Sequence, residues 1–93
     1  MTLISEDYDE TFAVIRDMAK VKMVMNSHKG RIEDLPPKEI LDLLYGEVAE
    51  LVDAADEDDL RHVIEEAADV HNFLVALVHQ AIARYRGRKK NEN

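Results

Sequence analysis

Apolar residues recur at intervals of three and four along most of the chain, which is the spacing of one face of an α-helix. The longest such pattern covers residues 59–85 and consists of Leu60, Val63, Ile64, Ala67, Val70, Leu74, Leu77, Val78, Ala81 and Tyr85. A second pattern covers residues 38–55 and consists of Leu41, Leu44, Val48, Leu51, Val52 and Ala55. No stretch alternates apolar and polar residues as a half-buried strand does. The hydrophobic pattern therefore predicts an all-α chain.

A further helix is predicted ahead of these two, ending near residues 26–30. Ser5 is placed to cap its start, with Glu6 and Asp7 in its first turn. Its apolar positions form two adjacent stripes, one of Tyr8, Phe12, Ile15 and Ala19 and one of Val14, Met18, Val21 and Met25. Two stripes are more than one partner helix can cover. We therefore expect an antiparallel helical bundle of three to four helices per chain, completed by oligomerisation.

Two turn segments separate the predicted helices. Residues 27–37 end in two prolines, and Pro37 suits the first turn of a helix because its missing N–H costs little there. Residues 55–59 are rich in acids, and we expect Asp56 or Asp58 to cap the helix that follows. A chain reversal near position 58 would join the second and third helices into a hairpin.

The size and composition limit the classes of protein that the chain can belong to. Its 93 residues include no cysteine, and its net charge is −8. We expect one domain over residues 1–86 and a basic, flexible C-terminal tail over residues 87–93. An acidic body disfavours nucleic acid as a partner, and the longest apolar run is too short for a membrane span of ~20 residues. The absence of cysteine and of a basic signal-peptide start is typical of a cytoplasmic protein.

Basic residues gather at the C-terminal end, namely Arg84, Arg86, Arg88, Lys89 and Lys90. Cations are favourable at the negative end of a helix dipole, so a solvated helix end accounts for this composition. The alternative is that these residues capture phosphate over a neighbouring acidic site.

Four acids on the second and third predicted helices carry the candidate chemistry: Glu47, Glu50, Glu66 and Asp69. The two members of each pair are three residues apart, so both carboxylates lie on one helix face. Reversal of the chain near position 58 brings the two pairs level. Four neighbouring carboxylates are hard to keep ionised unless a cation lies between them. The sequence therefore predicts a Mg²⁺ site, and oxygen ligands also suit Mn²⁺ as a substitute.

Two other interpretations of these acids remain open. A solvated acidic face would show the same spacing, and the chain would then be a non-catalytic acidic helical module that binds a basic partner or only assembles. A di-iron carboxylate bundle also lines its helices with glutamate, but it requires two Glu-x-x-His units. Here residues 59–62, Asp-Leu-Arg-His, are the nearest approach to that motif.

A basic loop precedes the second predicted helix, with His28, Lys29 and Arg31 around Gly30. Ammonium and guanidinium groups around a glycine are suited to an anionic ligand. A solvated basic loop would have the same composition.

Together these residues resemble a known family. The spacing Glu47-x-x-Glu50, then fifteen residues, then Glu66-x-x-Asp69 resembles the E-x-x-E…E-x-x-D signature of MazG-like all-α nucleotide pyrophosphohydrolases. The resemblance covers residues 27–82. It includes the run His-Lys-Gly at 28–30, and residues 68–73 are similar to the A-D-V-x-N-F run of small members.

The resemblance implies hydrolysis of a ribo- or deoxyribonucleoside triphosphate between its α and β phosphates, giving a monophosphate and pyrophosphate. It implies metal-binding and catalytic roles for Glu47, Glu50, Glu66 and Asp69. It implies substrate contacts from Lys29, Arg31, Asn72 and Phe73, the first two with phosphate and the others near the sugar or base. Phosphoribosyl-ATP pyrophosphohydrolase is a related alternative. Family resemblance also implies a homodimer or homotetramer, in which an active site draws residues from both subunits.

Two positions depart from the family pattern. Members often carry a further glutamate just before the first acid pair, where this chain has Gly46. Members with the His-Lys-Gly run often have a nearby tryptophan, where this chain has Ile32. The first change removes a carboxylate that would support the metal or activate water, and the second removes a ring that would stack on a base. Both changes are also compatible with an inactive relative.

Overall fold

The computed structural model describes residues 8–91, and the side chains of residues 8–88. The regular elements in this part of the chain are α1 (Tyr8–Met25), two short 3₁₀-helices (Ser27–Lys29 and Ile32–Asp34), α2 (Pro37–Asp56) and α3 (Leu60–Asn91). No strand occurs among the described residues, so the all-α prediction is confirmed. None of these helices is long and apolar enough to cross a membrane. The predicted cap at Ser5, with Glu6 and Asp7, lies outside the described residues.

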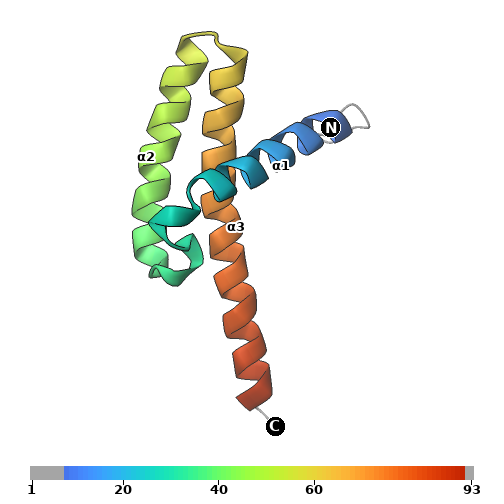
Figure 1. Cartoon of the computed structure of the whole chain (residues 1–93). Helices are drawn as coiled ribbons and strands as arrows, with labels where there is room; N and C mark the ends of the chain where they lie inside the picture. The colour runs from blue at the N-terminus through green and yellow to red at the C-terminus, as the bar shows by residue number, and fades with distance from the viewer. Residues whose placement is uncertain (1–7, 92–93) are drawn as a thin grey trace, which may run out of the picture.

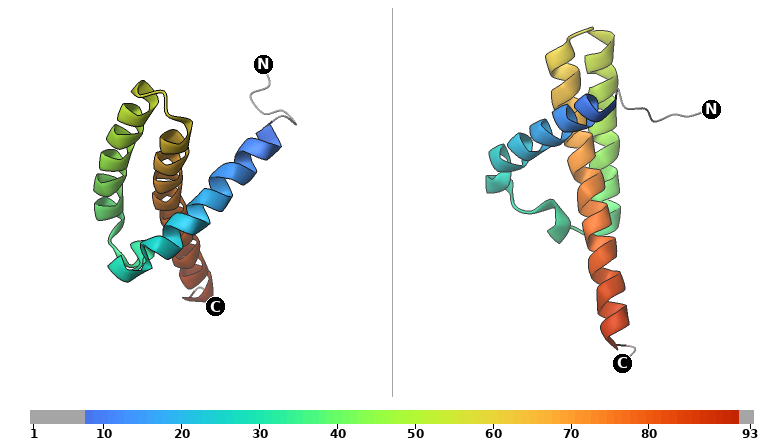
Figure 2. Two further views of the ribbon diagram at one scale, coloured as in Figure 1. Left: turned by 45° about the horizontal axis from the view of Figure 1, so that its top comes forward. Right: turned by 90° about the vertical axis from the view of Figure 1, so that its right-hand side faces the viewer.

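The longest two helices, α2 and α3, form an antiparallel hairpin, and α1 crosses α3 obliquely (Figure 1). Only the C-terminal half of α1 lies against the hairpin, and its N-terminal half projects away from it (Figure 2). The loop between α1 and α2 folds back beside α3, so three segments surround the middle of that helix. This arrangement places the candidate site where α1, the loop and the hairpin meet.

The helix α2 begins at its proline as predicted. Pro37 occupies the first turn, and the carbonyl of Pro36 accepts a hydrogen bond from the Ile40 amide at 3.1 Å. A proline in the first turn needs no hydrogen-bond donor, and its fixed φ angle suits a helix start. The observed span, Pro37–Asp56, exceeds the predicted one by a single residue at each end.

The reversal between α2 and α3 occurs at residues 57–59, as the spacing predicted, but the predicted cap is wrong. Asp59, and not Asp56 or Asp58, caps α3, because its Oδ1 accepts a hydrogen bond from the His62 amide at 3.3 Å. Asp58 instead adopts a left-handed conformation with φ of 54°. Aspartate tolerates that conformation better than most residues, so Asp58 turns the chain and leaves the capping position to its neighbour.

The helix α3 is longer than the periodic pattern predicted. We expected the helix to end near Tyr85, but it continues through Gly87 to Asn91. An isolated glycine weakens a helix by only about 1 kcal/mol, and the flanking basic residues are good helix formers at a helix end that favours cations. The predicted basic tail over residues 87–93 is helical as far as Asn91, and its flexibility stays a prediction. The domain boundary at residue 86 stays a prediction.

The core of this chain is small and consists largely of alanines. The fully buried apolar residues are Ala19, Ile40, Ala54, Ala68 and Ala76. On α2 the face toward α3 contains Ile40, Leu44, Glu47, Leu51 and Ala54, whereas the predicted core residues Leu41, Val48 and Val52 are exposed. The face of α2 that packs against α3 is therefore rotated relative to the predicted one. As a result, Glu47 lies within the packed face.

Candidate metal centre

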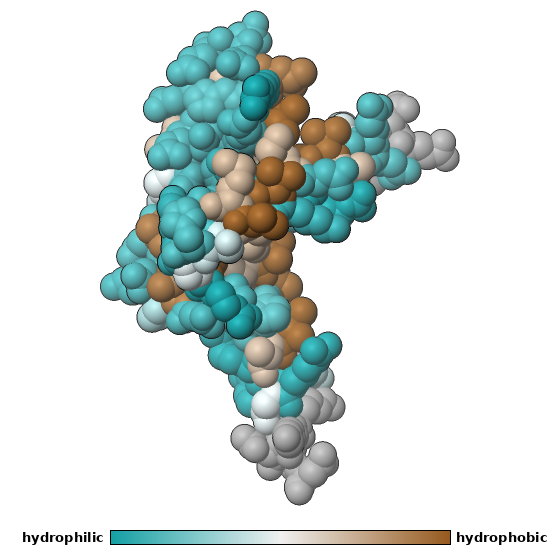
Figure 3. Space-filling model, viewed as in Figure 1, coloured by the Kyte–Doolittle hydropathy of each residue, from teal (hydrophilic) through white to brown (hydrophobic). Residues whose placement is uncertain are grey.

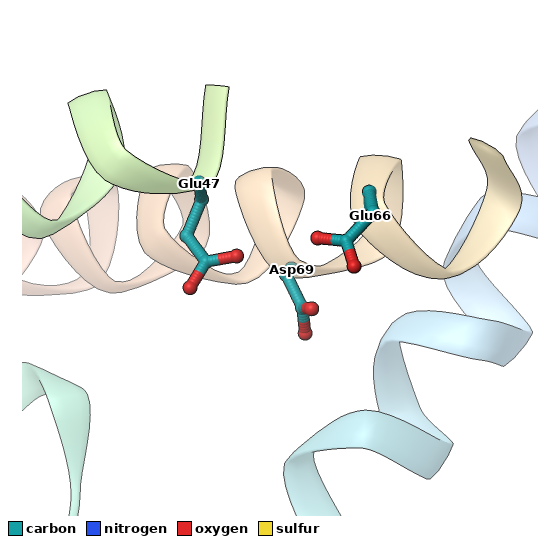
Figure 4. A group of neighbouring side chains, drawn as sticks. All are labelled: Glu47, Glu66 and Asp69. Carbon is teal, nitrogen blue, oxygen red and sulfur yellow. The ribbon is translucent and has the colours of Figure 1, made fainter. Parts of the chain in front are cut away.

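Three carboxylates meet between α2 and α3. Glu47 projects from α2, and Glu66 and Asp69 project from α3 toward the same space (Figure 4). One oxygen of each carboxylate lies within 4.8 Å of the other two. All three side chains are partly buried. For Glu47 the reason is that it lies on the packed face of α2. The prediction that the two acid pairs converge is thus realised for three of its four residues.

The fourth acid, Glu50, lies close to this group without belonging to it. Glu50 is exposed and lines the same cavity as the three clustered carboxylates. Its charge and its hydrogen bonding nevertheless raise the pKa of both Glu47 and Glu66.

The carboxylates of the site resist ionisation together. Burial is the main cause that raises the pKa of Glu47 to about 7, and the charges of Glu50, Asp69 and Glu66 and hydrogen bonding to Glu50 contribute the rest. Burial, followed by hydrogen bonding to Glu50 and the charges of Glu50 and Asp69, also raises the pKa of Glu66. Glu47 Oε2 and Glu66 Oε2 are buried and have no hydrogen-bond partner. A cluster of oxygen ligands in which two buried oxygens have no partner fits a divalent cation.

Two basic side chains already contact this cluster, and the sequence analysis assigned neither of them to it. Lys22 of α1 places its Nζ 3.3 Å from Asp69 Oδ2. His62 places its Nε2 3.3 Å from Glu66 Oε1 and its Nδ1 2.9 Å from Glu57 Oε2. Hydrogen bonding to Glu57 is the main cause of a raised pKa of His62.

A signal for Lys22 was present in the sequence. It lies three residues after Ala19 and four after Met18, and these spacings place a cation on the buried face of an apolar helix. Long cationic side chains are seldom buried without a partner. A lysine at such a position therefore indicates an acidic partner on the helix against which α1 packs.

The cluster forms part of the lining of a cavity of about 960 Å³. This cavity is bounded by the end of α1, the loop at residues 26–35, and the facing parts of α2 and α3. Its lining includes the eight residues to which the family resemblance gave metal or substrate contacts: Lys29, Arg31, Glu47, Glu50, Glu66, Asp69, Asn72 and Phe73. His28 of the basic loop is not among the lining residues. Four acids lie on the hairpin side, and the loop contributes Lys29 and Arg31 together with Glu33 and Asp34. The tertiary structure therefore brings the predicted residues into one place without testing their individual roles.

Arg31, one of the predicted phosphate contacts, is engaged with a neighbour. Its Nη2 and Nε lie 2.6 Å and 2.7 Å from Glu33 Oε1. This pairing raises the pKa of Arg31 and, after the hydrogen bond from the backbone of Glu33 itself, contributes to a lowered pKa of Glu33. Part of the positive charge that the loop offers to the cavity is thus offset locally, and Lys29 is exposed.

Asn72 serves the fold in a way that the sequence did not indicate. It is only 6% exposed, and its Nδ2 donates a hydrogen bond to the Ala19 carbonyl at 2.9 Å. This bond fixes α1 on α3 at the edge of the cavity. The predicted contacts of Asn72 and Phe73 with sugar or base stay predictions.

The loop that carries Lys29 and Arg31 is anchored to α3 by Gln80. Its Nε2 donates hydrogen bonds to the carbonyls of Glu33 and Leu35 at 2.9 Å and 2.5 Å. A single glutamine thereby satisfies two carbonyls of an irregular segment that has few other partners. Nothing in the local sequence pairs residue 80 with residues 33–35, so only the structure identifies this anchor.

Fold and site together define an all-α protein with an oxygen-ligand cluster on a helical hairpin. The family model described as phosphoribosyl-ATP pyrophosphohydrolase matches residues 18–83. The chain belongs to this family, which lies within the MazG-like all-α nucleoside triphosphate pyrophosphohydrolases, so the resemblance is confirmed. Members are hydrolases that act on nucleotides, and the chain is a nucleotide pyrophosphohydrolase at that level of description. No curated protein and no solved structure matches the chain.

Proposed function

We propose that the chain is a Mg²⁺-dependent nucleoside triphosphate pyrophosphohydrolase that cleaves ribo- or deoxyribonucleoside triphosphates between the α and β phosphates. The observation that carries this proposal is the group formed by Glu47, Glu66 and Asp69, with oxygens within 4.8 Å of one another at a cavity that basic residues also line. The volume of about 960 Å³ is at the upper end of the range of about 300–1,000 Å³ for small-molecule cavities.

The residues present fit a magnesium ion. Glu47, Glu66 and Asp69 would hold it, and Glu50 is close enough to complete an all-oxygen set. The two buried oxygens without partners, on Glu47 and Glu66, indicate that the site is built for a cation. When bound, Mg²⁺ would neutralise phosphate charge, lower the pKa of a bound water and stabilise the leaving pyrophosphate. Mn²⁺ fits the same oxygen ligands.

The chain itself would supply orientation and proton transfer. A carboxylate of the acid group would accept a proton from the attacking water, whose oxygen bonds to phosphorus while the bridging P–O bond between the α and β phosphates breaks and pyrophosphate leaves with its electron pair. Lys29 and Arg31 face the polyphosphate from the loop, and Phe73 offers an apolar surface to the sugar or base. Ile32 lines the cavity at the position where members with the His-Lys-Gly run often carry a tryptophan, so we expect no base stacking from residue 32.

A second candidate substrate is phosphoribosyl-ATP. The description of the matching family favours it, and the same acid group would perform the same cleavage. A non-catalytic acidic module is disfavoured because the matching family consists of hydrolases. The two candidate substrates share the polyphosphate and differ in the groups attached to it, which the cavity would also have to accommodate.

A substrate panel with Mg²⁺ tests the proposal. The panel contains the common ribo- and deoxyribonucleoside triphosphates and phosphoribosyl-ATP, with pyrophosphate and orthophosphate measured separately. We expect pyrophosphate as the primary product from at least one nucleoside triphosphate. Turnover of phosphoribosyl-ATP alone would select the second candidate, and orthophosphate as the sole primary product would contradict cleavage between the α and β phosphates.

We also propose that the chain works as a homodimer or homotetramer. Its accessible surface is 7460 Å², whereas a folded monomer of 10.6 kDa exposes about 5,500 Å². The excess of about 2,000 Å² compares with what one subunit buries in an obligate dimer. Apolar surface extends along the side of the molecule from which α1 projects (Figure 3). The exposed apolar residues of α3 include Leu74, Val75, Val78, Ile82 and Tyr85.

A charge on this surface is expected to weaken assembly. Val78 is 58% exposed, so Val78→Glu should leave the isolated chain folded while placing a carboxylate in an apolar interface. We expect light scattering to show a dimer or tetramer for the wild type and at least tenfold weaker association for Val78→Glu. The control is Lys38→Glu, an acid added at the exposed first turn of α2. A wild-type chain that is monomeric at all concentrations would contradict the proposal.

A further inference from the structure

Lys22 places a positive charge within the acid group. Its Nζ lies 3.3 Å from Asp69 Oδ2, and the two side chains are only 20% and 17% exposed. A partly buried lysine loses hydration, which the chain offsets by pairing it with a carboxylate. The partner is one of the three residues that fit a divalent ion, so the ammonium group and the metal would act on the same carboxylate.

Other contacts besides this ion pair hold α1 in place. One turn earlier on the same helix, the Ala19 carbonyl accepts the buried hydrogen bond from Asn72 at 2.9 Å. Ala19 itself is fully buried against α3. Because packing and this hydrogen bond already fix the crossing of α1 over α3, the position of Lys22 calls for another explanation.

The charges that line the cavity supply that explanation. Of the loop cations, Arg31 is already paired with Glu33, whereas Lys22 of α1 lines the cavity and contacts one of the acids. A polyphosphate bound at the acid group would bring several negative charges close to Lys22. The lysine stem has four rotatable carbons, so its ammonium group can exchange one oxygen partner for another without movement of the helix.

We propose that Lys22 is a phosphate-binding residue that neutralises Asp69 in the empty site and transfers its ion pair to the polyphosphate when nucleotide and metal bind. This inference rests on the proposed function. It predicts that removal of Lys22 has opposite effects on metal binding and on substrate binding. Without nucleotide, the ammonium group repels a divalent ion, so removing Lys22 should tighten metal binding. With nucleotide, removing Lys22 should weaken substrate binding.

The test compares Lys22→Met, which keeps most of the apolar stem, with Lys20→Met, which removes the same charge from an exposed position on the same helix. In thermal-shift titrations without nucleotide, we expect the Mg²⁺ midpoint of Lys22→Met to fall about three- to tenfold. We expect its KM for the nucleotide to rise at least about tenfold, with a smaller change in kcat. Lys20→Met should match the wild type, and Lys22→Arg should retain a KM within about threefold of it.

The two measurements separate this inference from a structural role. A lower Tm for Lys22→Met with an unchanged metal midpoint and an unchanged KM would overturn it, and so would a KM loss shared equally by Lys20→Met. If Lys22→Met does not fold, Lys22→Gln is measured in the same two assays with the same criteria. A wild type that shows neither a metal-induced shift in Tm nor pyrophosphate release would refute the proposed function. If only the Lys22 inference is wrong, the wild type still shows the metal-induced shift and the release of pyrophosphate.

Discussion

Glu66→Gln is expected to reduce pyrophosphate release at least about 100-fold and to abolish the rise in Tm that Mg²⁺ produces. Glutamine has nearly the shape of glutamate but carries no charge, so the substitution removes an anionic ligand without a change of volume. Glu66 is the central choice because it lies in the group of three carboxylates and has a buried oxygen without a partner. Activity is measured as pyrophosphate release, and metal binding by thermal shift.

The metal-free stability of this variant distinguishes a metal site from a general loss of structure. Burial and the neighbouring carboxylates raise the pKa of Glu66, so the neutral amide should relieve repulsion and raise the Tm of the metal-free chain. Glu65→Gln is the matched control, since Glu65 is paired with Arg61 at 3.0 Å and does not line the cavity. A Glu66→Gln variant that retains activity, or loses Tm without metal, would count against a shared metal site.

The metal-free chain is expected to lose stability as the pH rises from about 4.5 to about 7. The pKa of Glu47 is about 7 in the folded chain, against an ordinary value of 4.5. The folded state therefore binds more protons than the unfolded state in this window. The contribution of Glu47 is complete below pH 4.5 and is lost as the pH passes through about 7. We expect a loss on the order of 2 kcal/mol, because partial exposure reduces the full linkage value.

Bound Mg²⁺ should reverse the sign of this dependence. A metal requires ionised carboxylates, so the stability that it adds grows as the pH rises through the same window. The measurement is the free energy of unfolding in urea at several pH values, with a chelator and with saturating Mg²⁺. Glu47→Gln should flatten the metal-free profile. A metal-free profile that rises with pH between 5 and 7 would show that this carboxylate ionises freely in the folded chain.

Much of the hairpin could be predicted from the sequence because its determinants are local. Helical periodicity located α2 to within one residue at each end, and Pro37 marked its first turn. The acid spacing also predicted a reversal near position 58, which the structure places at residues 57–59. The residue that caps α3 could not be predicted, because four of the five residues at 55–59 are acids. Only the backbone conformation of the turn selects Asp59 as the cap.

The sequence by itself determined the helices, the acid pairs and the family, because helical periodicity and residue spacing along a helix are properties of neighbours in the chain. Only the tertiary structure decided which face of α2 packs against α3, and hence that Glu47 is buried while Glu50 is exposed. Only the tertiary structure shows that Lys22 contacts Asp69 and that Gln80 contacts the loop carbonyls. In both cases the partners are more than 40 positions apart in the sequence. Such contacts depend on how the helices cross, and the crossing depends on how side chains of different helices pack together, which a periodic pattern along one helix does not specify.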